Sequence, residues 1–270
     1  MEHNEPMGGD LDQQRLEREL AGIAGPVRYL KETGSTNSDA LDWAAEGAPE
    51  GALVVAEYQT AGRGRWGRSW ESARGSALLF SLILRPGPEA MGLLTTLAGV
   101  ACAAGIRGVT GLEAGLKWPN DVILRGRKVA GILVETRVAG SAVTGAVVGV
   151  GVNVSSRAED FPPDVGETAT SVGAEVDAAG GGEPPERVAL LAAILRQLDQ
   201  RYRTWAPHRL LEEATALSVI FGRRVRVRGP QGDVMEGVAR RLTTTGALEL
   251  EADGTLAVVE SGEVHRLDEP

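Results

Sequence analysis

The most constraining feature of the chain is a polar loop, residues 59–70, that separates two short apolar runs. It holds three glycines, three arginines and two tryptophans: Gln-Thr-Ala-Gly-Arg-Gly-Arg-Trp-Gly-Arg-Ser-Trp. The runs on either side, 52–58 and 76–84, are short, and Arg-Pro-Gly-Pro ends the second, which predicts two strands. Glycine lets a backbone approach a ligand closely, arginine suits carboxylates and phosphates, and tryptophan can stack on a flat heterocycle. The loop therefore predicts a site for an anion, and a nucleotide is the expected ligand.

The glycines of this loop also match the spacing G-x-G-x-x-G of dinucleotide-binding folds. In those folds a helix follows the loop directly, so that its N-terminus meets the pyrophosphate. Here a second strand is predicted instead, and no Gly-Lys-Ser/Thr follows to make a phosphate-binding P-loop. The context disfavours both nucleotide folds. On these residues alone, a charged hairpin loop without function remains open.

Composition limits the remaining classes. A chain of 270 residues, 43% hydrophobic and 24% charged, suits one large globular domain plus a small one. The net charge of -9 argues against non-specific nucleic-acid binding as the main role. The single cysteine, Cys102, excludes an internal disulfide and a cysteine-based metal cage, and its apolar neighbours predict a buried thiol. The three histidines lie far apart in sequence, which disfavours zinc and a Ser-His-Asp triad.

The sequence shows no signal peptide. The N-terminus is acidic and lacks the apolar core of a signal peptide. No apolar run approaches the roughly 20 residues that a membrane helix requires. The cytoplasm is therefore the expected location, with no membrane partner.

Periodicity and turn residues predict an α+β chain in three parts: an N-terminal extension over 1–25, a region of mixed strands and helices over 26–217, and a strand-rich region over 218–270. Strands are expected at 27–31, 52–58, 76–84, 128–137 and 141–150, and 116–124 is expected to form two short strands about a turn. Helices are expected at 10–24, from about 40, and at 89–108, 186–205 and 210–216. Residues 174–185, with three consecutive glycines and two prolines, predict an exposed loop.

Short alternating strands over 221–268 predict a small β-barrel. Its first strand carries Arg224, Arg226 and Arg228 at alternate positions, next to Arg223. These arginines suit either a binding patch or, more commonly, the solvated face of an exposed strand.

Four ordered motifs together resemble the signature of biotin–protein ligases. They are Gly-Arg-Gly-Arg-Trp-Gly-Arg-Ser-Trp at 62–70, Lys-Trp-Pro-Asn-Asp at 117–121, Lys-Val-Ala-Gly-Ile-Leu-Val-Glu at 128–135 and Gly-Val-Gly-Val-Asn at 149–153. The motifs cover 27–153, and 221–268 resembles the small C-terminal SH3-like domain of that family. The resemblance implies a mixed sheet packed with helices, similar to the class II synthetase-like catalytic domain of biotin and lipoate ligases, followed by an SH3-like barrel.

That resemblance also implies an activity. Biotin and ATP would give biotinyl-5′-AMP and pyrophosphate, and the biotinyl group would pass to a lysine of the biotin carboxyl carrier domain of acetyl-CoA carboxylase or a related carboxylase. ATP with Mg²⁺ is the expected co-substrate, without a tightly bound prosthetic group. Many family members carry an N-terminal winged helix that binds DNA, but only about 26 residues precede the first predicted strand here. We therefore expect a ligase without nucleic-acid binding; a homodimer stays possible.

Site residues follow from the same motifs. Neutral groups suit the ureido ring of biotin, and cations suit the meeting of a carboxylate with a triphosphate. The implied catalytic residues are Arg63, Arg65, Lys128 and Asp121. The implied biotin-binding residues are Ser35, Thr36, Asn37, Gln59, Arg63, Gly64, Arg65, Lys128, Gly131, Ile132 and Leu133. The implied ATP- or adenylate-binding residues are Arg63, Arg65, Arg68, Trp70, Asn120, Lys128 and Asn153.

Alternatives remain for several of these residues. Asp121 could hold Mg²⁺ or orient the incoming lysine. Ser35 or Thr36 could cap a helix, Trp70 could be a packing residue that anchors the loop, and Lys128 could be a solvated hairpin lysine. We expect the 62–70 loop to be mobile without ligand and to close over the adenylate. Lipoate–protein ligase and a non-catalytic biotin-sensing regulator are the alternative functions.

Overall fold

The structure is a computed structural model that describes residues 10–139, 142–163 and 165–267. The strands of its larger sheet are β1 (Val27–Leu30), β2 (Leu53–Ala56), β3 (Ala77–Leu84), β4 (Ala114–Lys117), β5 (Asp121–Leu124), β6 (Arg127–Ala139) and β7 (Ala142–Asn153). The smaller sheet contains β8 (Arg224–Arg228), β9 (Val234–Leu242), β10 (Leu248–Ala252), β11 (Thr255–Val259) and β12 (Glu263–Arg266). The helices are α1 (Gln13–Glu19), α2 (Thr36–Ala45), α3 (Pro88–Met91), α4 (Leu94–Thr110), α5 (Val172–Ala178), α6 (Arg187–Thr204) and α7 (Pro207–Leu217).

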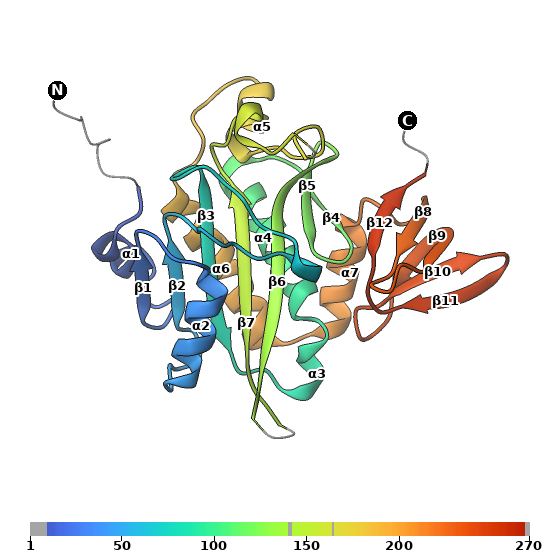
Figure 1. The fold of residues 1–270 in the computed structure, drawn as a ribbon, viewed down its shortest axis with the longest axis horizontal. Coiled ribbons are helices and arrows are strands. Elements are labelled where there is room, and N and C mark those ends of the chain that lie inside the picture. The colour runs from blue at the N-terminus through green and yellow to red at the C-terminus, as the bar shows by residue number, and fades with distance from the viewer. Residues whose placement is uncertain (1–9, 140–141, 164, 268–270) are drawn as a thin grey trace.

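The larger sheet is mixed and runs in the order β1-β2-β3-β7-β6-β5-β4, and the smaller one is antiparallel in the order β11-β10-β9-β8-β12 (Figure 1). β1 pairs with β2 in parallel, whereas the remaining pairs of the larger sheet are antiparallel. This architecture confirms the predicted α+β class, a mixed sheet packed with helices followed by a small SH3-like sheet.

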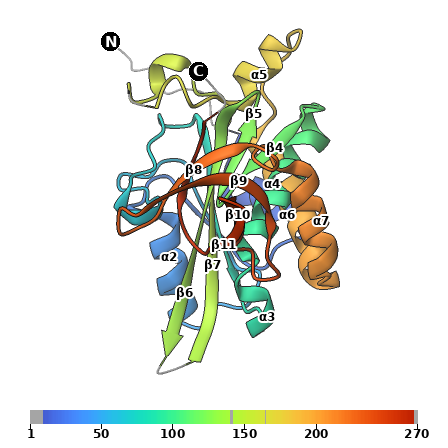
Figure 2. The same cartoon turned by 90° about the vertical axis from the view of Figure 1, so that its right-hand side faces the viewer.

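Helices cover both faces of the larger sheet, with α2 on one side and α4, α6 and α7 on the other (Figure 2). Neighbouring residues of β2 show the division. Leu53 and Val55 belong to the main core with α4 and α6, and Val54 packs with Ala40 of α2. Burial on both faces explains why the central strands are continuous apolar runs instead of alternating ones.

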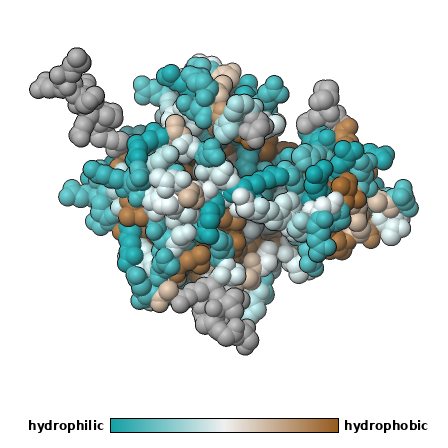
Figure 3. Space-filling model, viewed as in Figure 1, coloured by the Kyte–Doolittle hydropathy of each residue, from teal (hydrophilic) through white to brown (hydrophobic). Residues whose placement is uncertain are grey.

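Cys102 lies in α4 and is fully buried, as its apolar neighbours predict. Burial raises the pKa of its thiol to about 12. Within the described residues no helix has the length and apolar character to cross a membrane. The face in Figure 3 is largely hydrophilic, and its apolar areas are small and separated.

Two predicted elements were wrong. The helix expected over 89–108 divides into α3 and α4 around Gly92 and Leu93, where Leu93 has a φ of -100° and a ψ of 0°. The β9–β10 turn packs closely here, since a Cβ at Gly92 would lie 2.9 Å from the carbonyl oxygen of Thr245. The loop expected over 174–185 begins inside α5. Ser171 caps this helix by accepting a hydrogen bond from Ala174 N at 3.2 Å, and the glycines at 180–182, which follow it, all have positive φ.

Trp118 joins the two sheets. It stands in the β4–β5 turn of the larger sheet, yet its ring belongs to the core of the smaller sheet with Val225, Val227 and Leu250. Its Nε1 donates a 3.0 Å hydrogen bond to the carbonyl of Gly246 in the β9–β10 turn. The arginines of β8 point to solvent, in agreement with an exposed strand face.

Candidate active site

Three glycines on adjacent strands hollow out the floor of a pocket on the α2 side of the larger sheet. Gly131 of β6 pairs with Gly151 of β7, and Gly149 is the next inward-facing residue of β7. A Cβ at Gly151 would lie 2.6 Å from Cε2 of Trp70, and one at Gly149 would overlap the amide oxygen of Asn37. The missing side chains therefore allow Trp70 and Asn37 to lie directly on the sheet.

A network of neutral hydrogen-bonding groups lies at one end of this floor. Gln59 Oε1 accepts hydrogen bonds from Thr36 N at 2.7 Å and from Thr36 Oγ1 at 3.0 Å. The fully buried Ser81 hydroxyl lies 2.8 Å from Thr36 Oγ1 and 2.6 Å from Asn37 Oδ1. Ser35 occupies the N-cap position of α2, but its side chain makes no capping hydrogen bond. The network orients these groups, and the Ser35 hydroxyl stays available to a ligand.

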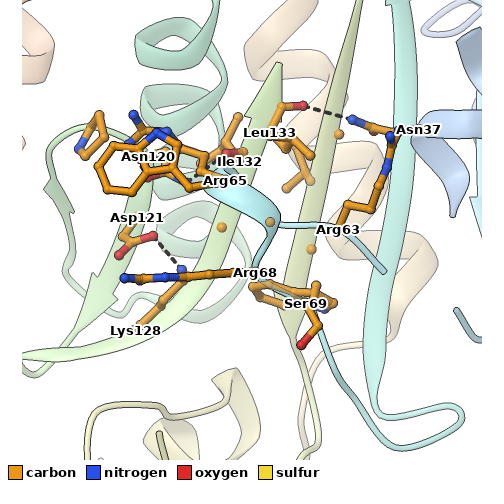
Figure 4. Close-up of a pocket in the computed structure, with 18 of the residues that line it drawn as sticks. Asn37, Arg63, Arg65, Arg68, Ser69, Asn120, Asp121, Lys128, Ile132 and Leu133 are labelled. Atoms are coloured by element: carbon orange, nitrogen blue, oxygen red, sulfur yellow. Dashed lines mark hydrogen bonds and ion pairs between the residues drawn. The ribbon is translucent and has the colours of Figure 1, made fainter. Parts of the chain in front are cut away.

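Asn37 connects this network to a charged pair. Its Nδ2 donates to the carbonyl of Leu133 at 3.2 Å and to Glu135 Oε2 at 2.8 Å. The same carboxylate oxygen lies 2.7 Å from Arg63 Nη2. Glu135 therefore holds one residue of α2 and one of the 62–70 loop together. Figure 4 shows Asn37 with its hydrogen bond to Leu133.

A second charged pair lies at the opposite end of the floor (Figure 4). Lys128 Nζ is 2.6 Å from Asp121 Oδ1 and 5.8 Å from the ring centroid of Trp70. Trp70 Nε1 is buried and has no hydrogen-bond partner among the described residues. Lys117 also lines the pocket, and within the described part of the chain it has no ion-pair partner. This end offers two ammonium groups and one indole N–H to an anionic ligand.

Backbone pairing fixes Lys128. Its N–H donates to the carbonyl of Thr168 at 2.7 Å, and its carbonyl accepts from the N–H of Thr170 at 2.9 Å. Asn153 Nδ2 donates to the Thr170 carbonyl at 3.0 Å. The buried carboxylate of Glu175 accepts from Thr170 Oγ1 at 2.6 Å. The backbone of Lys128 is therefore fixed by hydrogen bonds to a segment that is itself held in place by Asn153 and Glu175.

The 62–70 loop covers the floor and reaches the smaller sheet. Arg65 Nη2 donates to Ser261 Oγ at 2.6 Å, and its Nη1 donates to the Gly262 carbonyl at 3.3 Å. Arg68 forms two hydrogen bonds with Glu263, one of them 2.8 Å from Nη1 to Oε1. The hydrogen bond from Arg68 lowers the pKa of Glu263, and burial lowers the pKa of Arg65. Gly262 and Glu263 therefore complete the wall of the pocket.

The pocket has a volume of about 150 Å³. It brings together every residue predicted for the site except Asn153, which is 4% exposed and supports the segment beside Lys128 instead of lining the pocket. The sequence interpretation missed the five residues Ser81, Lys117, Glu135, Ser261 and Glu263. Three of them carried a signal: Ser81 interrupts an apolar strand, Lys117 opens the 117–121 motif, and Glu135 closes the 128–135 motif.

No cluster of three or more His, Cys, Asp or Glu suited to a metal ion occurs among the described residues. Asp121 is therefore a single carboxylate ligand at most. Mg²⁺ in phosphate chemistry is commonly held by one or two carboxylates together with substrate phosphates. The residues present fit an ion that ATP brings with it, and they do not form a dedicated metal cage.

Comparisons with known proteins identify the family of the chain. The sequence model of the Biotin/lipoate A/B protein ligase family matches residues 29–153, and that of the Biotin protein ligase C terminal domain matches 220–266. The chain is 38% identical to a biotin--[acetyl-CoA-carboxylase] ligase of Mycobacterium tuberculosis over 95% of this chain and 96% of that protein. It is 36% identical to the bifunctional ligase/repressor BirA of Bacillus subtilis over 85% of this chain and 70% of that protein.

The fold has solved counterparts. A biotin protein ligase from Aquifex aeolicus in complex with biotin and ATP superposes with a TM-score of 0.73 at 24% identity, covering 89% of this chain and 98% of that one. A biotin protein ligase from Leishmania major in complex with biotinyl-5-AMP superposes with a TM-score of 0.62 at 23% identity, covering 90% and 99%. Sequence matches over nearly the whole length, together with this fold, confirm the resemblance, and the chain belongs to the biotin protein ligase family.

Proposed function

We propose that this protein is an ATP-dependent biotin–protein ligase. It forms biotinyl-5′-AMP from biotin and ATP, and then transfers the biotinyl group to a lysine of the biotin carboxyl carrier domain of a carboxylase. The observation that carries the proposal is the arrangement along the glycine floor: an ordered neutral network at one end, and Lys128 with Lys117 at the other.

The neutral end suits the ureido ring of biotin, which has one carbonyl and two N–H groups. Ser35, Thr36 and Asn37 supply donors and acceptors, and Gln59 fixes the backbone of Thr36. Thr36, Asn37 and Gln59 already belong to one hydrogen-bond network with Ser81 in the free protein, so little ordering of these groups remains when the ring binds. Gly131, Ile132 and Leu133 of β6 supply close backbone and apolar contacts to the rest of the molecule.

The charged end suits the first chemical step. A carboxylate oxygen attacks the α-phosphorus of ATP, the bond between the α- and β-phosphates breaks, and pyrophosphate leaves. Two anions meet in this step, so fixed cations lower its barrier by stabilising charge in the transition state. We assign that role to Lys128 with Arg63 and Arg65, and phosphate contacts to Arg68. Arg63 must leave Glu135 to take part, because the two residues are ion-paired without ligand.

We assign adenine stacking to Trp70 and a contact with the adenylate to Asn120, which also lines the pocket. Mg²⁺ would be held by Asp121 and the phosphates of ATP, where it would neutralise phosphate charge. Asp121 can bind this Mg²⁺ only after its ion pair with Lys128 is broken. Asn153 acts on the adenylate through the segment that it supports.

The pocket must open before it can bind these substrates. Its 150 Å³ is below the roughly 300–1,000 Å³ of typical ligand sites. Trp70 and the 62–70 loop fill the missing space, since they lie on the glycine floor. We propose that this loop opens to admit ligand and closes again over the adenylate, which would shield the mixed anhydride from water.

The remaining assignments belong to the same proposal. Residues 26–217 form the catalytic domain, residues 218–270 form the C-terminal domain that holds the loop, and residues 1–25 are an extension. We place the protein in the cytoplasm, without a nucleic-acid partner. Dimers are compatible with the proposal.

The test is a transfer reaction followed by mass spectrometry. The protein is incubated with ATP, Mg²⁺ and a purified carrier domain, together with biotin or with lipoate. We expect the carrier to gain the mass of one biotinyl group and to gain nothing with lipoate. If the carrier gains mass with lipoate but not with biotin, the protein is a lipoate ligase. Binding of biotin without any gain in mass identifies a non-catalytic sensor, and either result overturns the proposal.

A further inference from the structure

A second and larger cleft adjoins the pocket along the 61–69 loop. We call it the outer cleft; its volume is about 1070 Å³. Its walls are the loop, the start of α4, residues 132–135 of β6, the β9–β10 turn at 245–247 and Glu260. It shares the loop residues 63–66 and the turn at 118–120 with the pocket. A molecule in the outer cleft would therefore lie against the same loop that covers the pocket.

The second step of the proposed function requires a separate route to this site, and the inference rests on that function. The biotinyl and AMP groups fill the pocket after the first step. The lysine amine must then reach the acyl carbon from a direction that neither group occupies. It forms the amide bond as the bond to the phosphate oxygen breaks, AMP leaves with the electron pair, and the proton from nitrogen goes to water.

We propose that the outer cleft receives the acceptor lysine and the chain beside it on the carrier domain. The charges of the cleft support this occupant. Its arginines are engaged: Arg63 pairs with Glu135, Arg68 pairs with Glu263, and Arg65 donates to the 261–262 turn. Glu260 is exposed and has no ion-pair or hydrogen-bond partner within the described residues. Among the charged residues that line the cleft, Glu260 is therefore the one without a partner in the described part of the chain, and its carboxylate attracts a lysine ammonium and steers its approach.

Trp66 gives the cleft an apolar contact. It is 43% exposed, and its φ of 57° lies in the left-handed region that bulky residues avoid. Such strain persists only where the surroundings hold it, and it concentrates at functional sites. Arg65 contributes to holding it, with its guanidinium 4.9 Å from the ring centroid of Trp66. An exposed, rigidly presented tryptophan is typical of the anchor residues of protein interfaces.

The charge of Glu260 and the ring of Trp66 therefore give the outer cleft the two elements that a lysine-bearing segment needs. The carboxylate matches the ammonium, and the indole can cover the methylene chain or an apolar neighbour of the lysine. Free biotin and ATP carry no ammonium group, so this pairing distinguishes the acceptor from the other two substrates.

The two half-reactions separate this inference from the proposed function. The first is measured as biotin-dependent exchange of pyrophosphate into ATP, without carrier. The second is measured as transfer of the biotinyl group to a purified carrier domain and, in parallel, to hydroxylamine, a nucleophile too small to need a docking site. We expect Glu260→Lys to raise the KM for the carrier at least 10-fold, with pyrophosphate exchange and hydroxylamine transfer within twofold of the parent protein.

Two further variants complete the test. Trp66→Ala should lower carrier transfer relative to hydroxylamine transfer at least fivefold, and Trp66→Tyr should restore most of it. Glu183→Lys, an equal charge change at an exposed residue that lines neither cavity, should leave the carrier KM unchanged. An unchanged carrier KM in Glu260→Lys, or an equal loss in both half-reactions, would overturn the inference. Absence of biotin-dependent exchange in the parent protein would instead overturn the proposed function.

Discussion

Arg68 and Glu263 connect the glycine–arginine loop to the C-terminal sheet through two parallel hydrogen bonds, one of them 2.8 Å long. Their positions are 195 residues apart in sequence. Together with the bonds from Arg65 to the 261–262 turn, this pair makes the smaller sheet a support for the loop that covers the pocket. The C-terminal domain therefore acts on the site through the loop.

Replacing Glu263 should weaken that support. An exposed ion pair contributes about 0.2–1 kcal/mol, so Glu263→Gln should raise the KM for ATP by a factor of about 1.4 to 5. It should also speed proteolytic cleavage between residues 62 and 70. The matched control is Glu249→Gln, which breaks the pair with Arg241 on the same sheet, where neither residue lines the pocket. Equal kinetics and equal cleavage rates in the two variants would show that the loop does not depend on Glu263.

The same pair should make loop support depend on pH. Arg68 lowers the pKa of Glu263 in the folded protein below the ordinary value of 4.5. The stabilisation is thus fully present above about pH 4.5 and is lost as the pH falls through the lowered pKa. The difference in Tm between the parent protein and Glu263→Gln should therefore be constant from pH 6 to 8 and should shrink below pH 4.5. A difference that grows in acid would contradict this linkage.

A substitution in the glycine floor should have a larger effect. In Gly151→Ala the new methyl group would lie 2.6 Å from the Trp70 ring, so the indole must leave its place. Overpacking of this kind costs about 1–3 kcal/mol, and the methyl group also occupies part of the floor on which ligand would lie, so we expect biotin affinity to fall roughly 5- to 150-fold in calorimetric titration. Gly108→Ala is the control, because Gly108 lies in α4 with no atom within 4 Å of the added Cβ. That variant should bind biotin normally and be more stable by about 0.5–1 kcal/mol.

Cys102 should be unreactive in the native protein. It is completely buried, and burial raises the pKa of its thiol to about 12, so the reactive thiolate is scarce at any pH below that value. We expect no mass gain with iodoacetamide at pH 8, and one full addition in denaturant. Rapid labelling under native conditions would show that α4 opens.

Much of the fold and of the site could be predicted from local pattern. The strands at 53–56 and 77–84 and the turn at Arg125–Gly126 follow from runs of apolar residues and from turn chemistry. Most of the predicted pocket residues lie in the four motifs that occur in the same order in the biotin–protein ligase signature. The helix break at Gly92 was not predicted, and the carbonyl of Thr245, which packs closely against it, comes from far along the chain. Likewise Glu263 carries no local signal, since its partner Arg68 lies far away in sequence.

Asn153 shows the same limit within the site. Its motif was interpreted as a direct adenylate contact, whereas its amide holds the Thr170 carbonyl beside Lys128. The residue type and its place at the end of β7 were visible in the sequence. The direction of its side chain was not, because it depends on a segment that packs there from later in the chain.

Ser81 should prove to be a positioning residue for biotin. Its buried hydroxyl lies between Thr36 Oγ1 and Asn37 Oδ1, and its loss would leave a buried acceptor without a donor. Such a loss costs about 1–3 kcal/mol, which corresponds to roughly 5- to 150-fold weaker biotin binding in Ser81→Ala. The KM for ATP should stay within twofold, because the network does not reach Lys128.

Ser81→Cys restores a donor of similar size and should recover part of the affinity. Ser76→Ala is the matched control: Ser76 is also buried, and its hydroxyl bonds to Ala73 and Ser156 outside the pocket. It should lower the Tm and leave biotin affinity unchanged. If Ser81→Ala and Ser76→Ala lost stability and biotin affinity in the same proportion, Ser81 would be a structural residue only, and the order of the neutral network would have to come from Gln59 and Glu135 alone.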